Sequence, residues 1–247
     1  MNTRERVIEA LERAKGEYVS GEVLAGSCGI SRNAIWKAVA GLRKNGYAIT
    51  SVRNRGYMLE QETDILSKAG ICLYLNKGTG EAKTAYRILV YDELDSTNNE
   101  AKRNLIFGDR SILHKTVIAA KRQTAGRGHG GSRFSSPDGG IYLSIILEPE
   151  KLKEPGIPVS EKASSAVQSV LEELFGTVLE KKKDSSLYAG GEKVCGILTE
   201  GISDLETGKY SNYIVGIGIY AEKLQNGKTA SPRKNEIAAG ILKKLDF

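Results

Sequence analysis

The residues from Gln123 to Ser144 have the composition of an anion-binding loop. They include six glycines and two arginines and lie between two apolar, strand-like runs at 116–120 and 141–147. Glycine lets backbone N–H groups come close to a phosphate or carboxylate, and Arg127 can add a planar set of donors. A surface loop without chemical importance can have the same composition, so the glycines alone leave both interpretations open.

Two nucleotide-binding patterns are excluded in this loop. Gly126, Gly128 and Gly131 match the G-x-G-x-x-G spacing, but Pro137 and a further glycine pair follow where a dinucleotide-binding loop needs a helix. No Gly-Lys-Ser/Thr sequence follows, which excludes a Walker loop. An anion bound here would therefore be held by a strand-to-strand loop.

Three other stretches place polar residues or glycines at predicted element boundaries. The Asp-Ser-Thr-Asn stretch at 95–98 is predicted to cap a helix beginning near Asn99, as a plain N-cap or as a set of hydroxyls that hold an anion or a ureido-type group. Lys193 begins the second strand of a predicted hairpin, where a lysine is most often a surface residue. Gly216 and Gly218 lie inside a predicted strand and allow another group to approach closely.

The first sixty residues have the pattern of a winged helix-turn-helix domain. Apolar residues recur at helical spacing in residues 7–14, and Ser20 and Ser31 are placed to cap two further helices. Residues 47–52 and 57–59 are predicted to form two strands around a tight turn. In this arrangement the third helix enters the major groove of DNA.

The distribution of charge favours DNA binding by this region. Residues 1–60 hold ten Lys and Arg against six Asp and Glu, within a chain of net charge +6. No acidic residue occurs between Val23 and Leu59, where six basic ones do, and phosphate binding requires such a positive field. A charged helix face can also be plain solvated surface. The residues predicted to contact bases or phosphates are Arg32, Asn33, Trp36, Lys37 and Arg43 on the third helix, and Arg53 and Arg55 on the wing.

Size and composition restrict the class of protein. With 247 residues, 40% of them hydrophobic, the chain has room for two or three domains with real cores. It has no apolar run long enough to cross a bilayer and no signal-peptide core near its start, so a cytoplasmic protein with no membrane partner is expected. Its three cysteines are far apart, which fits a reducing compartment. With two histidines and no Cys-x-x-Cys pattern, a structural zinc site is not expected, and no residue is assigned as a metal ligand.

The elements that would position these residues divide the α+β chain into three parts. Residues 1–60 are predicted to be the winged helix-turn-helix DNA-binding domain, 61–84 a linker and leading segment with a short helix, and 85–247 a larger catalytic or sensor domain. The larger domain is predicted to end with a helix at 236–245 that is capped by Asn235.

Four stretches of the larger domain occur in a specific order and spacing. They are Asp-Ser-Thr-Asn at 95–98, Gln-Thr-Ala-Gly-Arg-Gly at 123–128 with Ser-Pro-x-Gly-Gly at 136–140, Lys-Val-Cys-Gly-Ile-Leu-Thr-Glu at 193–200, and Gly-Ile-Gly-Ile at 216–219. Together with the winged helix they resemble the biotin protein ligases of the bifunctional type that also act as biotin operon repressors. The resemblance covers the chain from the winged helix to the last helix. It implies a class II synthetase-like α+β domain with a mixed, mainly antiparallel sheet.

The resemblance also implies a reaction in two steps. The carboxylate of biotin attacks the α-phosphate of ATP to form biotinyl-adenylate, with Mg²⁺ if the protein is catalytically active, and a lysine of a biotin carboxyl carrier protein then accepts the biotinyl group. Arg127 and Lys193 would be catalytic, because they neutralise the charge of the reacting groups. In the repressors the adenylate promotes homodimerisation, which places two winged helices on a palindromic operator. The residues implied to bind biotin or its adenylate are Ser96, Thr97, Asn98, Gln123, Gly126, Arg127, Gly128, His129, Lys193, Gly196, Gly216 and Gly218.

The sequence departs from the family pattern in four ways. The family loop usually reads Gly-Arg-Gly-Arg-x-Gly-Arg-x-Trp, and His129, Ser132 and Phe134 replace its later arginines and tryptophan. The family's Lys-Trp-Pro-Asn-Asp is Lys-Lys-Asp-Ser-Ser at 182–186, which is expected to remove the carboxylate nearest the chemistry. Tyr220 replaces an asparagine. The small C-terminal β-barrel domain of the family is expected to be missing.

These departures predict a biotin-responsive transcriptional repressor with weakened ligase activity. Each missing donor that is aimed at the transition state can cost roughly 2.7–4 kcal/mol, whereas the residues of the biotin pocket and Lys193 remain. Two alternatives stay open. One is a fully active bifunctional ligase and repressor, and the other is a winged-helix regulator that senses another carboxylate such as lipoate.

Overall fold

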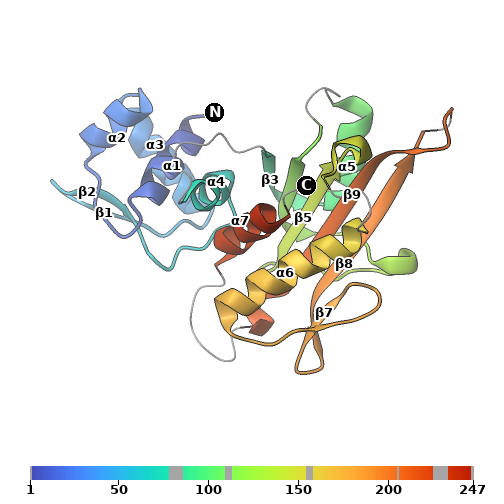
Figure 1. Cartoon of the computed structure of the whole chain (residues 1–247). Helices are drawn as coiled ribbons and strands as arrows, with labels where there is room; N and C mark the ends of the chain where they lie inside the picture. The colour runs from blue at the N-terminus through green and yellow to red at the C-terminus, as the bar shows by residue number, and fades with distance from the viewer. Residues whose placement is uncertain are drawn as a thin grey trace.

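The computed structural model describes residues 2–77, 86–108, 113–153, 158–204, 206–224 and 233–245. The predicted boundary between residues 84 and 85, and the last residue, 247, lie outside these ranges. Figure 1 shows a small N-terminal part, in blue, beside a larger sheet, with helices between them.

The N-terminal part is a helical core closed by a two-stranded ribbon. Ser20 and Ser31 cap the second and third helices by accepting a hydrogen bond from a backbone N–H three residues further on, as predicted. The apolar faces of the three helices meet in one buried cluster that includes Leu11, Leu24 and Ile35. The elements are α1 (Thr3–Arg13), α2 (Gly21–Cys28), α3 (Arg32–Lys44), β1 (Ile49–Val52) and β2 (Gly56–Leu59).

The larger part contains a seven-stranded sheet in the order β3-β4-β5-β9-β8-β7-β6. β3 and β4 are parallel, and the other neighbouring strands are antiparallel, which confirms the predicted mixed, mainly antiparallel sheet. The strands are β3 (Arg87–Leu94), β4 (Thr116–Gln123), β5 (Ile141–Leu147), β6 (Glu180–Lys181), β7 (Leu187–Ala189), β8 (Glu192–Ser203) and β9 (Tyr210–Ile219).

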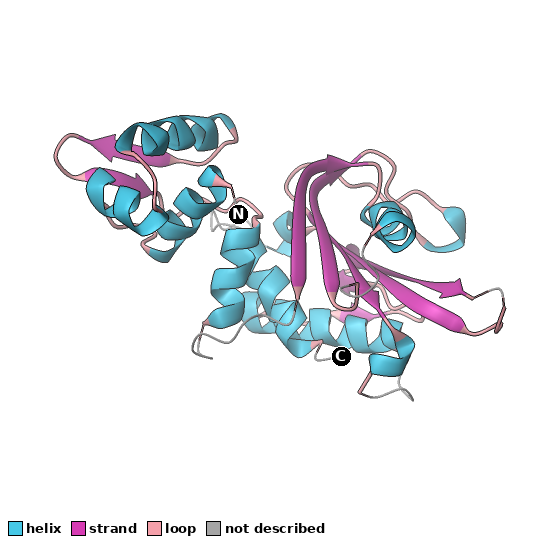
Figure 2. Ribbon diagram, turned by 90° about the horizontal axis from the view of Figure 1, so that it is seen from above, coloured by secondary structure: helices cyan, strands magenta, loops and turns pink. Residues whose placement is uncertain are grey.

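Helices pack on both faces of this sheet (Figure 2). On one face, α6 and α7 contribute to a large apolar core with Leu143 of β5 and Val215 and Ile217 of β9. On the other face, α5 packs through Ala101 against Ile118. Side chains alternate along β9, so its glycines face the same side of the sheet as α5. The helices are α5 (Thr97–Phe107), α6 (Val159–Phe175) and α7 (Lys234–Lys244), with short 3₁₀ turns η2 (His129–Gly131), η3 (Pro149–Lys151) and η4 (Ala221–Leu224).

The helix α4 (Lys68–Asn76) lies between the two parts and contacts both α1 and α7 (Figure 1). The prediction that Asn235 caps the last helix is wrong, because α7 begins at Lys234 and Asn235 faces the segment before α4. Asn235 Oδ1 accepts a hydrogen bond from Ser67 N at 2.9 Å. The carboxylate of Asp64 instead accepts from the N-terminal backbone N–H of α7 at 2.9 Å. The segment between the two parts is therefore fastened to α7.

Three general features concern the described residues alone. None of their helices combines the length and the apolar character needed to cross a bilayer. Cys28, Cys72 and Cys195 are free thiols. No group of three or more His, Cys, Asp or Glu side chains is gathered as a metal site would require in the described ranges.

Candidate functional site

The first turn of α5 presents three polar side chains to the protein interior. Ser96, Thr97 and Asn98 are each no more than 4% exposed. The helix begins at Thr97, two residues earlier than predicted, and Ser96 occupies the N-cap position without a side-chain capping hydrogen bond. These side chains are therefore directed inward, where their hydrogen-bonding groups need partners.

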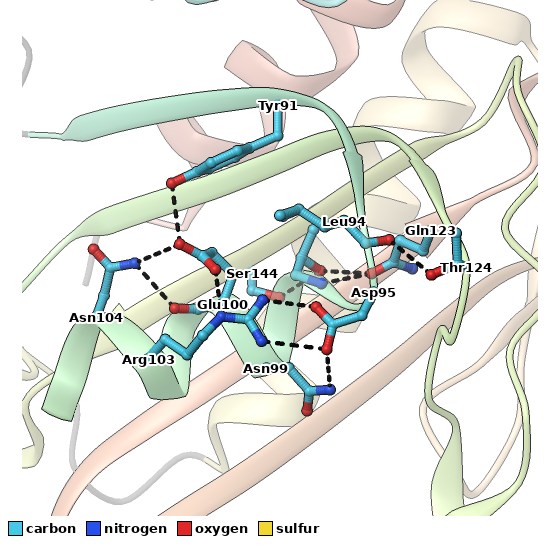
Figure 3. A network of polar contacts seen from close by, with 11 residues as sticks. Tyr91, Leu94, Asp95, Asn99, Glu100, Arg103, Asn104, Gln123, Thr124 and Ser144 are labelled. Atoms are coloured by element: carbon cyan, nitrogen blue, oxygen red, sulfur yellow. Dashed lines mark hydrogen bonds and ion pairs between the residues drawn. The ribbon is translucent and has the colours of Figure 1, made fainter. Parts of the chain in front are cut away.

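A network of charged residues holds this turn in place (Figure 3). Arg103 donates to both carboxylate oxygens of Asp95, at 2.7 and 3.3 Å, and its Nε donates to Glu100 at 2.6 Å. Asn99 also donates to Asp95, and the Tyr91 hydroxyl donates to Glu100. Hydrogen bonding from Arg103 is the largest cause of a pKa of Asp95 well below its ordinary value, so this carboxylate is ionised at neutral pH.

Gln123, the last residue of β4, connects this turn to the glycine loop. Its Oε1 accepts hydrogen bonds from the backbone N–H and the hydroxyl of Thr97, at 2.7 and 3.1 Å. Its Nε2 donates to Oγ of the buried Ser136 at 2.8 Å. Because the two ends of an amide differ, these partners determine which end of Gln123 faces the helix.

A second polar cluster extends from Thr97 across the sheet. Ser144 Oγ on β5 lies 2.7 Å from Thr97 Oγ1 and 2.5 Å from Asn98 Oδ1. Asn98 Nδ2 donates to Glu200 on β8 at 2.7 Å. A glycine is required at position 216 on β9, because a Cβ at Gly216 would lie 2.4 Å from Asn98 Oδ1. The carboxamide of Asn98 is therefore held at both ends and against the sheet.

The loop between β4 and β5 folds back on itself. Phe134 N donates to Gly126 O at 2.9 Å, and a β-bridge joins Arg127 to Arg133. Gly126 lies at the closest approach, where a Cβ would be 2.4 Å from Phe134 O. This pairing brings the arginine at 133 to the same region as the predicted one at 127.

Two glycines open a notch in the sheet beneath the loop. Gly196 on β8 is paired with Gly218 on β9, and their added Cβ atoms would lie 2.6 and 2.3 Å from the Phe134 ring. The ring fills this notch and stacks on Tyr220, with ring centres 5.2 Å apart and 13° between the planes. The Tyr220 hydroxyl donates to Ser135 O at 2.8 Å. The residues that replace the family's tryptophan and asparagine therefore contact each other.

These elements surround a cavity of about 330 Å³, within the range of roughly 300–1,000 Å³ of small-molecule sites. The cavity brings together all but one of the residues implied to bind biotin or its adenylate. The exception is Gly126, which is buried within the loop and does not line the cavity. The lining includes Ser96, Thr97, Asn98, Gln123, Arg127, Gly128, His129, Lys193, Gly196, Gly216 and Gly218.

The charges of the basic side chains that line the cavity are not neutralised by ion pairs with acidic residues in the described part of the chain. Lys193 is half-buried, and within the described ranges neither Lys193 nor Arg127 forms an ion pair. Arg133 also lines the cavity and donates to Thr124 O at 3.4 Å. Unpaired guanidinium and ammonium groups of this kind attract a carboxylate or phosphate.

Asp184 is the single carboxylate that lines the cavity in the described part of the chain. Ser186 occupies the position of the family's carboxylate, but the same stretch supplies another carboxylate through Asp184. The turn between β6 and β7, closed by the hydrogen bond from Lys182 N to Ser186 O at 2.9 Å, carries Asp184 at its tip. Hydrogen bonding from Ser186, followed by the charges of Lys193 and His129, lowers the pKa of Asp184.

The residues predicted to contact DNA are exposed on α3 and on the β1–β2 wing. Trp36, the chain's one tryptophan, is 61% exposed, although large aromatic side chains are usually mostly buried. Arg32 pairs with Glu22 at 2.6 Å, which reduces its free charge. Arg43 donates to Ile49 O at 2.8 Å, and the Arg55 guanidinium lies 4.1 Å from the centre of the Tyr18 ring. The exposed residues are Arg32, Asn33, Trp36, Lys37, Arg43, Arg53 and Arg55.

Comparison with protein families covers both parts of the chain. A family model described as HTH domain matches residues 3–58. A model described as Biotin/lipoate A/B protein ligase family matches residues 94–219, more than half of the chain. The chain belongs to this ligase family.

Curated relatives match along most of this ligase-family chain. It is 30% identical over 224 residues to Bifunctional ligase/repressor BirA of Bacillus subtilis, covering 90% of this chain and 66% of the relative. It is 31% identical over 210 residues to the Escherichia coli protein of the same name, covering 83% and 60%. The chain thus spans less than two thirds of the length of these relatives. A solved biotin protein ligase from Leishmania major shares the fold, with a TM-score of 0.53 and 21% identity over 64% of this chain and 73% of that one.

Some residues of this site give little signal in the sequence. Ser144 is a polar residue inside an otherwise apolar strand, and Glu200 closes a matched motif, so both could have been noticed. The contributions of Arg133 and Asp184 depend on how two turns fold and have no local signal. The residues that sequence reasoning did not assign to the site include Arg133, Phe134, Ser136, Ser144, Asp184 and Glu200.

Proposed function

We propose that this ligase-family protein is a biotin-responsive transcriptional repressor that binds biotin or biotinyl-adenylate in the cavity. The observation that carries the proposal is the joining of two regions in one cavity: oxygen acceptors at the start of α5, and unpaired cations from the glycine loop and β8. Biotin has a cyclic urea with two N–H donors and a carboxylate, so its polar groups match both regions. The names of the curated relatives, bifunctional ligase/repressor, support the same function.

The oxygen cluster favours a ligand that carries N–H donors. Oxygens of Gln123, Thr97, Ser144 and Asn98 follow one another at hydrogen-bonding distances in that order, and the hydroxyls of Thr97 and Ser144 supply one proton each. Unused lone pairs therefore remain for the N–H groups of a cyclic urea. The dithiolane of lipoate has no N–H group, and burying oxygens without donors costs roughly 1–3 kcal/mol for each group. This difference favours biotin over lipoate.

The cationic residues suit a carboxylate and a phosphate that react with each other. Arg127 and Lys193 would stabilise the charge that develops when the biotin carboxylate attacks the α-phosphate of ATP. His129 and the uncharged Ser132 replace two arginines that are usual in the family. Arg133 lines the cavity and supplies one guanidinium in addition to that of Arg127. Adenylation, and with it transfer to a biotin carboxyl carrier protein, is therefore weakened.

A Mg²⁺ ion would accompany ATP and neutralise part of its phosphate charge. Mg²⁺ in nucleotide sites is usually bound by one or two carboxylates together with the phosphates. Asp184 in the cavity lining is a carboxylate with a lowered pKa, so the donor set fits the ion. Asp184 would be the protein ligand of the ion.

The winged helix would bind operator DNA in the cytoplasm. The exposed face of α3 and the basic wing supply groups for the major groove and the phosphates. A homodimer that forms when the cavity is occupied would place two such helices on the half-sites of a palindromic operator. Biotin binding would then control operator binding by raising the fraction of the protein that is dimeric.

Calorimetric titration of the whole chain tests the ligand. We expect saturable binding of biotin in the presence of ATP and Mg²⁺, and binding of lipoate at least about tenfold weaker. Arg127→Ala should weaken the binding of biotin with ATP, whereas the matched control Arg122→Ala should not, because Arg122 pairs with Glu93 and does not line the cavity. Absence of biotin binding would refute the proposal, and tighter binding of lipoate would support the alternative regulator.

A transfer assay separates the repressor from a fully active ligase. The protein is incubated with biotin, ATP, Mg²⁺ and a biotin carrier domain, and modified carrier is followed over time. We expect transfer well below the range of about 1–10³ s⁻¹ of ordinary enzymes. Transfer inside that range would establish the alternative, a fully active bifunctional ligase and repressor.

A further inference from the structure

Glu200 lies behind the cavity, on β8, and joins two residues of α5. Its Oε2 accepts from Asn98 Nδ2 at 2.7 Å, and its Oε1 pairs with Lys102 Nζ at 2.7 Å. Asn98 and Lys102 are four residues apart and so lie on the same face of the helix. Glu200 does not line the cavity, but Asn98 does. Any effect of Glu200 on a ligand must therefore pass through Asn98.

The charge of Glu200 determines how the carboxamide of Asn98 is turned. Burial alone would raise the pKa of Glu200, but hydrogen bonds from Lys102 and Asn98 and the charges of Lys102 and Arg127 bring this pKa below its ordinary value. An ionised carboxylate can only accept hydrogen bonds. The group of Asn98 that faces Glu200 must therefore be its NH₂.

This orientation leaves the oxygen of Asn98 on the side of Ser144, with Oδ1 and Oγ 2.5 Å apart. Gly216 limits the movement of the Asn98 carboxamide, because even a Cβ at position 216 would lie 2.4 Å from Asn98 Oδ1. If the carboxamide turned over, an NH₂ group would replace an oxygen in the cluster around Ser144. That cluster would then offer donors where a cyclic urea also has donors.

We propose that Glu200 is the positioning residue for ligand selectivity: by holding the NH₂ of Asn98, it presents the Asn98 oxygen to the N–H groups of a cyclic urea. Lys102 completes the arrangement by neutralising Glu200. The inference rests on the proposed function, since it assumes that the cavity receives biotin. It adds a residue outside the cavity lining that selects the head group of the ligand.

Calorimetry with biotin on the full-length chain tests this role. Glu200→Gln keeps the shape of the side chain but allows it to donate as well as accept, so Asn98 is free to turn over. We expect the dissociation constant for biotin to rise by about ten- to hundredfold. The matched control is Glu173→Gln, because Glu173 also pairs with a lysine, Lys244, at 2.7 Å and does not line the cavity. We expect this control to change the constant by less than about twofold.

A second variant separates positioning from a merely structural role. In the double variant Asn98→Asp with Glu200→Gln, the glutamine NH₂ faces one carboxylate oxygen and the other oxygen faces Ser144. We expect this exchange to restore most of the biotin affinity, whereas urea unfolding of Glu200→Gln should differ little from that of Glu173→Gln. Unchanged biotin affinity in Glu200→Gln, or no recovery in a folded double variant, would overturn the inference alone. If the unaltered chain does not bind biotin, the proposed function fails as well.

Discussion

Replacement of Gly218 by alanine tests the packing of the glycine loop on the sheet. The added methyl group would lie 2.3 Å from Cε1 and 2.6 Å from Cζ of Phe134, well inside the 3.4 Å at which ordinary contact begins. Gly218 does not have a positive φ, so its backbone conformation is also accessible to alanine. The Phe134 ring, rather than the strand, must therefore move out of the notch.

The cost of this movement follows from the contacts that the ring loses. Phe134 stacks on Tyr220 and meets the edge of Tyr142, with ring centres 5.2 and 6.5 Å apart. Each aromatic pair contributes about 0.5–1.5 kcal/mol beyond the area that it buries. We expect Gly218→Ala to lower the free energy of unfolding by about 1–3 kcal/mol. Biotin affinity should also fall, because the same loop carries Arg127.

Urea unfolding monitored by circular dichroism, combined in a double-mutant cycle, checks this prediction. In a Phe134→Ala background the notch is empty, so Gly218→Ala should cost less than about 0.5 kcal/mol. Gly26→Ala is the control, because a Cβ at Gly26 meets nothing within 4 Å. An equal cost of Gly218→Ala with and without the Phe134 ring would show that the ring is not what fills the notch.

Three further predictions concern the cavity, the wing and the turn before α5. Lys193→Met should slow adenylate formation, measured as pyrophosphate release, by about 10²–10³-fold, and an unchanged rate would remove the role of Lys193. Arg53→Ala should weaken binding to all DNA sequences and reduce the salt slope of affinity by about 1, whereas the control Arg13→Ala on α1 should do neither. Asp95→Asn should lower stability by up to about 1 kcal/mol above pH 4, since its pair with Arg103 is partly exposed. Because the folded pKa of Asp95 is lowered, this difference should disappear as the pH falls from about 4 through the folded pKa, and a difference that grows in acid would contradict the assignment.

Much of the fold could be predicted from local patterns. The caps at Ser20 and Ser31 and the strand at 141–147 agree with the structure, because capping and hydrophobic periodicity act over a few residues. The order of the motifs likewise indicated the cavity that contains Gln123 and Lys193. Boundaries were less accurate: α5 begins at Thr97 because Gln123, far away in sequence, accepts from its backbone N–H.

Other features depend on contacts between distant segments. Asn235 has the residue type of a helix cap, yet it binds the segment before α4, and Asp64 takes over the end of α7. A motif comparison sees only that a carboxylate is missing from its usual position, whereas a turn brings Asp184 to the cavity from two residues earlier. The same limit applies to Glu200, whose effect on Asn98 exists only because β8 and α5 meet. Residue types and spacing therefore indicate the class of ligand and the family, while the orientation of each polar group depends on partners that the folded chain brings together.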